Sequence, residues 1–182
     1  MTPEPFVQMS ASGLCAPAAI MNAMRYLFPR RMVESSEDVL AALMDAYPSD
    51  VRSLVKDGCD RPEIEMMIIG LHRWTETKGW PPWFFRSLHP QKGETAEAFW
   101  DAIAAELEMP YTAALIGFGD HTRSNTRYEP HFTVASSVTN REVHLCDSDV
   151  YKRIARKDTG IRPELGWAIE DAWIFSRSDL NN

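Results

Sequence analysis

The feature that most constrains the fold is a change of hydrophobic period at Pro110. Before Pro110, apolar residues recur three or four positions apart, which is the spacing of one helix face. After it they form short apolar or alternating runs, which are typical of strands. Helices followed by strands predict an α+β protein, in which an N-terminal helical lobe (1–109) packs on a C-terminal antiparallel β-sheet lobe (110–182). No repeat or linker divides the lobes, so we expect a single domain over 1–182.

Apolar spacing and end signals give each element approximate bounds. Pro29 ends the first helix, because the residue before a proline leaves helical geometry. The aromatic, proline-rich connection 79–94 is expected to pack on the helical lobe rather than form a binding groove. The expected helices are 15–28, 36–46, 50–56, 62–79 and 95–107, and the expected strands are 111–118, a hairpin of 131–138 and 141–147, and 171–176.

Composition argues against several functional classes. Hydrophobic residues make up 45% and charged residues 25% of the 182 positions, as in ordinary globular proteins. A net charge of -7 argues against binding nucleic acid or an anionic membrane through a basic surface. The sequence shows no transmembrane segment and no signal peptide, and its three widely spaced cysteines do not resemble a disulfide framework. We therefore expect a cytoplasmic protein with no nucleic-acid or membrane partner.

One cysteine stands at a position suited to nucleophilic chemistry. Cys15 directly precedes a segment of strong helix formers, with Pro17 just inside the helix start, where its missing N–H costs nothing. A thiol at this position faces unpaired backbone N–H groups and the positive end of the helix dipole, and both favour the thiolate. Because a cysteine at a helix start is usually only a small buried residue, Cys15 is a candidate nucleophile only if the chain also supplies a base.

Residues elsewhere in the chain can fill the other roles of thiol catalysis. His131 begins a predicted strand and Asp147 ends the next one, so the outer ends of this hairpin can bring a base and an orienting carboxylate together. This pairing requires a three-residue turn or a bulge, whereas a two-residue turn puts Ser148 opposite His131. Gln8 can turn its side-chain amide toward a substrate carbonyl oxygen, with the backbone N–H of Cys15 as the second oxyanion donor.

Four short motifs follow one another along the chain: Gln8, Cys15-Ala-Pro-Ala-Ala, His131-Phe-Thr-Val and Val-His-Leu-Cys-Asp147. Their order resembles that of papain-like cysteine peptidases, and most closely the C39-like group, which includes the peptidase domains of bacteriocin-processing transporters. The resemblance implies a papain-like fold with Cys15 as nucleophile and His131 as general base. It further implies that Asp147 orients the histidine and that Gln8 is the oxyanion donor.

The chain departs from the C39-like pattern at two positions. Ala16 stands where that group has a glycine, which makes the turn into the helix bulkier and bears on substrate access to Cys15. Ser148 stands where a proline is frequent, which leaves Asp149 as an alternative to Asp147 for orienting the histidine. Both carboxylates therefore stay open as candidates.

Other residues compete for these roles. His121, in the polar loop before the hairpin, is an alternative base. His144 and Cys146 alternate along one predicted strand and, with Asp149, form a candidate metal set. No second Cys/His pair supports such a set, so we expect no metal and no cofactor. His89 has the pattern of an ordinary surface or loop histidine.

These observations predict thiol-dependent hydrolysis of an amide bond in a peptide or protein. Two alternatives stay open. The same triad can pass the acyl group to an amine or another thiol, as an acyltransferase or a transglutaminase-like enzyme does. The chain can instead be a catalytically inactive module that holds a peptide in its cleft, and Ala16 is the sequence hint for that reading.

Overall fold

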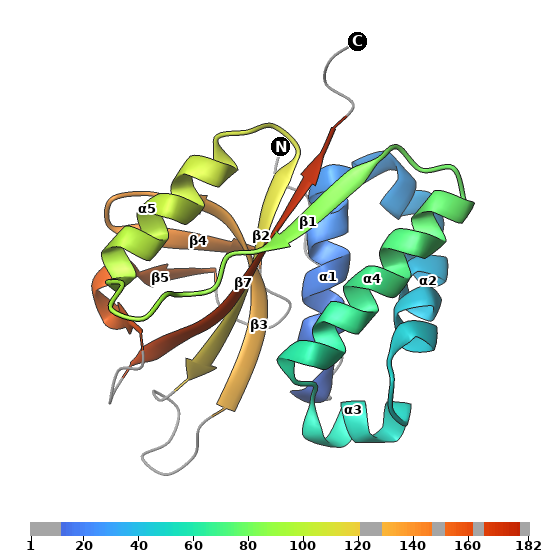
Figure 1. Ribbon diagram of the computed structural model, residues 1–182, viewed down its shortest axis with the longest axis horizontal. Helices are drawn as coiled ribbons and strands as arrows, with labels where there is room; N and C mark the ends of the chain where they lie inside the picture. The colour runs from blue at the N-terminus through green and yellow to red at the C-terminus, as the bar shows by residue number, and fades with distance from the viewer. Residues whose placement is uncertain (1–11, 121–128, 147–151, 162–165, 179–182) are drawn as a thin grey trace.

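The N-terminal part of the molecule is helical, in a computed structural model that describes residues 12–120, 129–146, 152–161 and 166–178. A 3-10 turn, η1 (Ser12–Leu14), leads into α1 (Cys15–Leu27), α2 (Pro29–Ala46), α3 (Val51–Asp57) and α4 (Arg61–Thr77). A sheet lies beside these helices (Figure 1), so the predicted α+β class is confirmed. Among the described residues, no helix is both long and apolar enough to cross a membrane.

Within the described residues the sheet has seven strands, and the last of them in sequence, β7, lies between two others. Its order is β1-β7-β2-β3-β4-β5, and the short β6 pairs with β7. The described pairings are antiparallel except that of β6 with β7. The strands are β1 (Trp83–Ser87), β2 (Thr112–Asp120), β3 (Glu129–Val138), β4 (Glu142–Cys146), β5 (Arg153–Ala155), β6 (Thr159–Gly160) and β7 (Trp167–Arg177), and a 3-10 turn, η2 (Arg156–Asp158), precedes β6.

The boundary between the helical and sheet parts differs from the predicted one. We expected the helical lobe to extend to residue 109 and to include 79–94 as an irregular connection. Instead, β1 forms within that connection and pairs with β7, and α5 (Ala96–Leu107) packs on β2 and β3. A five-residue edge strand between proline-rich segments carries little local signal, because its pairing partner lies far away in sequence.

Local capping explains where the helices begin and end. Phe28 leaves helical geometry at φ −135° and ψ 60°, immediately before Pro29, which ends α1 as predicted. Asp60 and Glu63 form a capping box at the start of α4: each carboxylate accepts from the other residue's backbone N–H, at 3.0 Å and 2.9 Å. Such a cap stabilises a helix by about 1 kcal/mol.

The second helix is longer than predicted. We expected 36–46, whereas α2 begins at Pro29 and passes through a kink at Ser35, where φ is −131° and ψ is 19°. Proline is tolerated in the first turn of a helix, so Pro29 both ends α1 and starts α2. The predicted helix is the part of α2 that follows the kink.

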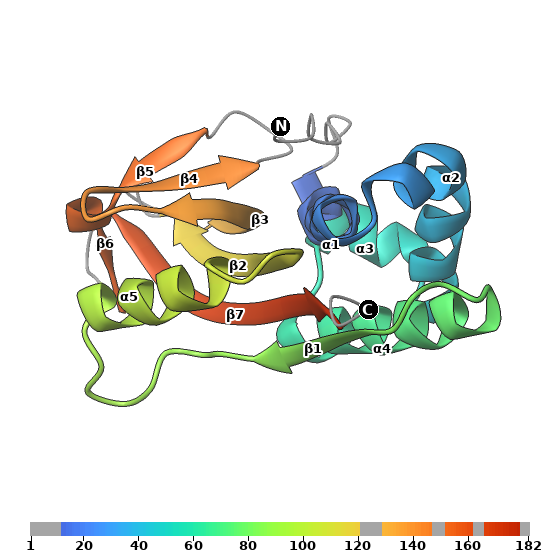
Figure 2. The ribbon, with the colours of Figure 1, turned by 90° about the horizontal axis from the view of Figure 1, so that it is seen from above.

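Two apolar cores lie on opposite faces of the sheet. The first core lies between the sheet and α1–α4, and the second core lies under α5; Figure 2 shows α1 and α5 on opposite sides of the central strands. Trp80 and Trp83 belong to the first core. Trp80 packs edge-on against Trp74 of α4 at 5.9 Å, and Trp83 Nε1 donates to Thr75 of α4 at 2.8 Å, so these aromatic residues pack on the helical part as predicted. Each large apolar side chain buried in this way contributes about 1.5–3 kcal/mol.

Candidate functional site

Cys15 is the first residue of α1, where η1 passes into the helix. It belongs to the first core and is 5% exposed, and Ala16 beside it is fully buried. Leu14, the residue before the helix, makes no side-chain capping hydrogen bond. The Leu14 side chain therefore leaves the first backbone N–H groups of α1 to a thiolate or an oxyanion.

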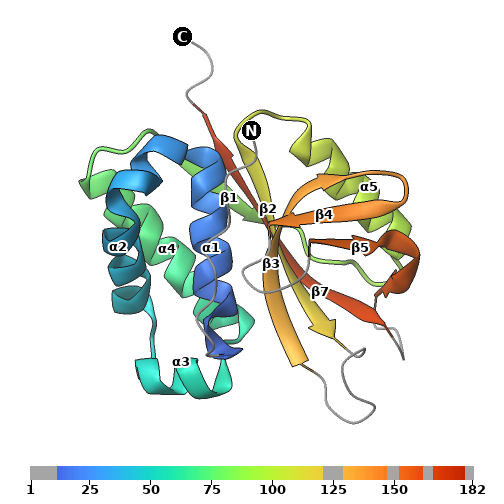
Figure 3. The same ribbon diagram turned by 180° about the vertical axis from the view of Figure 1, so that it is seen from behind.

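α1 lies along β3, and the two run in the same direction (Figures 1 and 3). Near the end of α1, the Tyr26 hydroxyl lies beside Ser136 of β3 and Cys146 of β4, and burial raises the pKa of Tyr26 to about 12. Cys15 precedes Tyr26 by about 16 Å of helix. His131 precedes Ser136 by about 17 Å of strand. Cys15 and His131 are therefore level with each other along the contact between α1 and β3.

Strand alternation puts His131 on the other face of β3 from Cys15. Val134 belongs to the first core with Cys15, whereas Ala135 belongs to the second core. His131 shares the face of Ala135, and its cross-strand partner Phe118 also belongs to the second core. A dyad of Cys15 and His131 therefore requires the imidazole to turn around the start of the strand toward α1. We expected the strand end to present this ring directly to the helix. The alternation along β3 does not support that expectation.

Four candidate residues lie outside the part of the chain that the structure describes: Gln8, His121, Asp147 and Asp149. Their roles as oxyanion donor, alternative base and orienting carboxylate stay predictions. Within the described ranges, no group of three His, Cys, Asp or Glu side chains lies close enough to hold a metal ion.

The described hairpin register ends before the candidate carboxylates. The structure has a turn at 139–142 and a bulge at Ser136, and the last described pair beyond this bulge is Val134 with Cys146. The hairpin therefore has a bulge rather than a strict two-residue turn. Asp147 and Asp149 lie outside the described residues, so both stay candidates for orienting His131.

His89 lies in a cluster of ionisable groups that the sequence did not reveal, and His89 and Asp171 are its most buried members. It follows β1, and its Nδ1 accepts a hydrogen bond from the Ala172 N–H of β7 at 3.2 Å. Asp171 Oδ1 lies 3.3 Å from the same nitrogen, and Glu65 Oε1 of α4 lies 3.8 Å from Nε2. Arg61 contacts Glu65 at 3.4 Å and Asp171 at 3.7 Å. His89 lies in a loop, as predicted, but its side chain is only 13% exposed, so its prediction as an ordinary surface histidine is wrong.

Burial shapes the ionisation of this cluster. Burial first, and then the positive charge of Arg61, lower the pKa of His89, and burial raises the pKa of Asp171. Because His89 Nδ1 accepts the Ala172 N–H, the proton of the neutral ring is assigned to Nε2, which is covered by the protein. A ring with both nitrogens covered does not reach a substrate. We therefore interpret this cluster as a structural joint between α4, β7 and the segment after β1.

The sequence contains one sign of this joint, an aspartate on the buried face of a strand. In β7, Asp171 alternates with Trp173 and Phe175, which both belong to the first core. A carboxylate on such a face needs a partner, because burying it alone is costly. The identity of the partners depends on α4 and on the segment after β1, so the sequence pattern alone does not name them.

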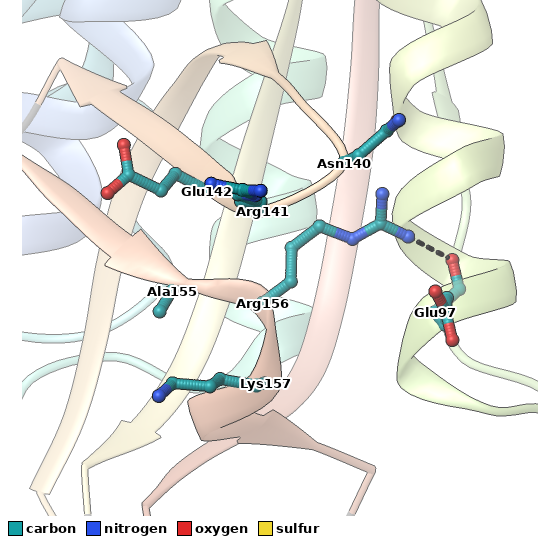
Figure 4. Close-up of a pocket in the computed structure, with 7 residues that line it drawn as sticks. All are labelled: Glu97, Asn140, Arg141, Glu142, Ala155, Arg156 and Lys157. Carbon is teal, nitrogen blue, oxygen red and sulfur yellow. Dashed lines mark hydrogen bonds between the residues drawn. The ribbon is translucent and has the colours of Figure 1, made fainter.

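A surface pocket of about 490 Å³ opens near the β3–β4 turn, between η2 and α5 (Figure 4). Arg156 lines it, with a side chain only 9% exposed. Its guanidinium donates to the Glu97 carbonyl and to the Asp101 carboxylate, both at 2.8 Å. These bonds tie η2 to α5, so Arg156 has a structural role here. Neither Cys15 nor His131 lines this pocket.

No protein-family model and no curated protein matches the chain. Among the described residues, Cys15 offers a thiol at a helix start, and His131 offers a half-buried imidazole at the same level along β3. A thiol and an imidazole are the two groups that thiol-dependent attack on a carbonyl group uses.

Proposed function

We propose that this protein is a papain-like cysteine hydrolase, similar to the C39-like peptidases, that cleaves an amide bond in a peptide or protein. The observation that carries the proposal is the matched spacing along α1 and β3, which brings Cys15 level with His131. The start of α1 adds a positive electrostatic environment for a thiolate. The order of the four motifs supports the same assignment.

The proposed reaction uses one thiol and one imidazole in two stages. The Cys15 thiolate attacks the substrate carbonyl carbon, and the backbone N–H of Cys15 and the Gln8 amide hold the oxyanion. The His131 imidazolium protonates the departing amine as the C–N bond breaks, which leaves a thioester on Cys15. His131 then takes a proton from water, and the resulting hydroxide hydrolyses the thioester and restores the thiolate. Asp149 or Asp147 is the carboxylate proposed to orient His131.

We propose the cytoplasm as the site of action. The three cysteines of the chain are free thiols in the structure. Free thiols without a disulfide framework suit a reducing compartment, where a nucleophilic cysteine stays reduced. The substrate class in this proposal is a peptide or protein chain, and no nucleic acid or membrane takes part.

A catalytically inactive peptide-binding module is the second candidate, and the surroundings of Cys15 favour it. Cys15 is only 5% exposed, and Ala16 is fully buried where the resembling family has glycine. Strand alternation also assigns His131 to the face opposite the first core. A module of this kind binds a peptide without any requirement for the thiol.

Cleavage of a complex peptide mixture, read by mass spectrometry, tests the proposal. The wild-type protein should generate new peptide termini, and Cys15→Ala should reduce their rate of formation by at least about 10³-fold. Cys59→Ala, which removes a nearby thiol, is the matched control and should retain the activity. Full activity in Cys15→Ala would contradict the hydrolase proposal. Specific peptide binding by the wild-type protein without cleavage would favour the binding module.

The same assay separates hydrolysis from acyl transfer. With a primary amine added in excess, a hydrolase should still release mainly free carboxylates. Amide products carrying the added amine would assign the acyl-enzyme to a transferase, because both reactions share the same thioester. Cys15→Ala should abolish either product.

A further inference from the structure

Cys15 and Cys59 lie on chain segments that contact each other near the start of α1. Gly13, two residues before Cys15, packs so tightly on α3 that an added Cβ would lie 1.8 Å from the Leu54 carbonyl oxygen. The same oxygen accepts a hydrogen bond from the Gly58 N–H at 3.0 Å. Gly13 and Gly58 therefore meet at one carbonyl oxygen, and Cys59 is the next residue after Gly58.

The environment of Cys59 indicates that its sulfur is a neighbour of the Cys15 sulfur. Cys59 is half-buried and packs against the first core, which contains Cys15. Burial raises the pKa of Cys59, and the charge of Cys15 raises it further. Electrostatic coupling falls with distance, so this effect agrees with the backbone contact between η1 and α3. Cys146 lies beside Tyr26, near the other end of α1.

We propose that Cys15 and Cys59 form a reversible disulfide under oxidising conditions and that this bond blocks the Cys15 thiol. The regulatory meaning of the bond rests on the proposed function, whereas its formation does not. The geometry required is a Cα separation of about 4.4–6.8 Å. The shared contact of Gly13 and Gly58 with the Leu54 carbonyl brings together the two chain segments that carry Cys15 and Cys59.

Hydrogen peroxide is the oxidant in the proposed chemistry. The Cys15 thiolate attacks one peroxide oxygen, which forms a sulfenic acid and releases hydroxide that becomes water. The Cys59 sulfur then attacks the sulfenic sulfur, its thiol proton leaves with the hydroxyl group as a second water, and the S–S bond forms. Two thiols and one peroxide thus give one disulfide and two waters. Because Cys59 holds its proton more tightly than an ordinary cysteine, peroxide should oxidise Cys15 first, which leaves Cys59 as the second thiol.

Peptide mapping without reduction tests the bond directly in the wild-type chain. The native protein is treated with hydrogen peroxide, its free thiols are alkylated, and it is digested with trypsin. Cleavage at Arg25 and Lys56 separates Cys15 from Cys59, so a disulfide joins two otherwise distinct peptides. We expect this linked peptide to increase with peroxide and to disappear after dithiothreitol, with Cys146 still alkylated. Oxidised Cys15 without a link to Cys59 would overturn the proposal.

Two alanine variants sharpen the test. After peroxide and then dithiothreitol, alkylation of Cys15 should recover in wild type and in Cys146→Ala, and should be largely lost in Cys59→Ala. The loss is expected because a sulfenic acid without a resolving thiol oxidises further to irreversible products. Equal recovery in the two variants would contradict the inference. Full peptidase activity in Cys15→Ala would instead contradict the proposed function. The disulfide mapped in the wild-type protein would still stand, so the two failures are distinguishable.

Discussion

Two histidines, His89 and His131, differ in what surrounds them. His89 is enclosed by the Ala172 N–H and by two carboxylates, and its Nε2 is covered. His131 is half-buried near the start of β3, level with Cys15. A dense cluster of ionisable groups therefore marks a structural joint when the protein covers its members. Catalysis needs a group that a substrate can reach.

The His89 cluster also fixes a large aromatic side chain. Trp173 packs edge-on against His89, with ring centroids 5.3 Å apart, and its Nε1 donates to Glu65 at 3.3 Å. Trp173 is fully buried in the first core. Removing one member leaves a buried polar group without its partner, which costs about 1–3 kcal/mol. The cluster is therefore expected to affect stability rather than turnover.

Substitution of the two histidines tests the comparison most strongly. His131→Ala should lower the rate of peptide cleavage by about 10²–10⁴-fold, because it removes the proposed general base. His89→Gln should leave the cleavage rate within about twofold of wild type, since His89 is covered by the protein. Steady-state rates on one identified peptide substrate provide the measurement. A larger loss in His89→Gln than in His131→Ala would reverse the assignment of the two sites.

The orienting carboxylate should have a smaller effect than the base, because it acts through the His131 ring. Asp147 is the candidate with the stronger motif support, so Asp147→Asn should lower the cleavage rate by about 10²-fold. Asp149→Asn is the matched control and should change the rate less. The pH profile of the cleavage rate separates positioning from simple damage to folding, since loss of the carboxylate should shift the limb assigned to His131. A larger effect of Asp149→Asn would assign the orienting role to Asp149.

The smallest expected effect is a pH-dependent change in stability at the joint. The folded-state pKa of His89 is lowered from its ordinary value of 6.5, chiefly by burial. The unfolded chain therefore binds this proton more readily, so the contribution of His89 to stability is present above pH 6.5 and is lost as pH falls through the folded pKa. Asp171 has a raised pKa, so its contribution is present below its ordinary value of 3.8 and is lost as pH rises through the folded pKa.

Urea unfolding of His89→Gln at several pH values checks this sign. We expect the variant to lose about 1–2 kcal/mol of unfolding free energy near neutral pH, and less at about pH 5. The difference should shrink because the wild-type protein, and not the variant, loses stability as His89 takes up a proton. A difference that grows on acidification would show that the pKa of His89 is raised in the folded protein.

Local signals were enough to predict the helical part, and pairing between distant segments explains what was missed. Pro29 ends α1 as expected, but the same residue also starts α2, which a stop signal alone does not reveal. β1 depends on β7, which follows it by many residues, so its own aromatic sequence does not indicate a strand. The predicted α+β class is still correct, because it depends only on the change of hydrophobic period at Pro110.

The candidate site shows the same division between local and distant information. The helix start at Cys15 was predictable, since it depends on the residues that follow it. The face occupied by His131 was not, because β3 carries apolar residues on both faces and alternation does not say which face meets α1. The cluster at His89 combines α4, β7 and the segment after β1, and each contributes only one or two of its groups.

The central claim is that Cys15 is an activated nucleophile, and comparative alkylation tests it most directly. The reduced native protein is exposed to iodoacetamide at about pH 6, and mass spectrometry gives the rate at each cysteine. The account predicts that Cys15 reacts at least about tenfold faster than Cys59 and Cys146, although Cys59 is the more exposed thiol, because burial raises the pKa of Cys59. Equal rates at the three cysteines, or the fastest reaction at Cys59, would contradict it.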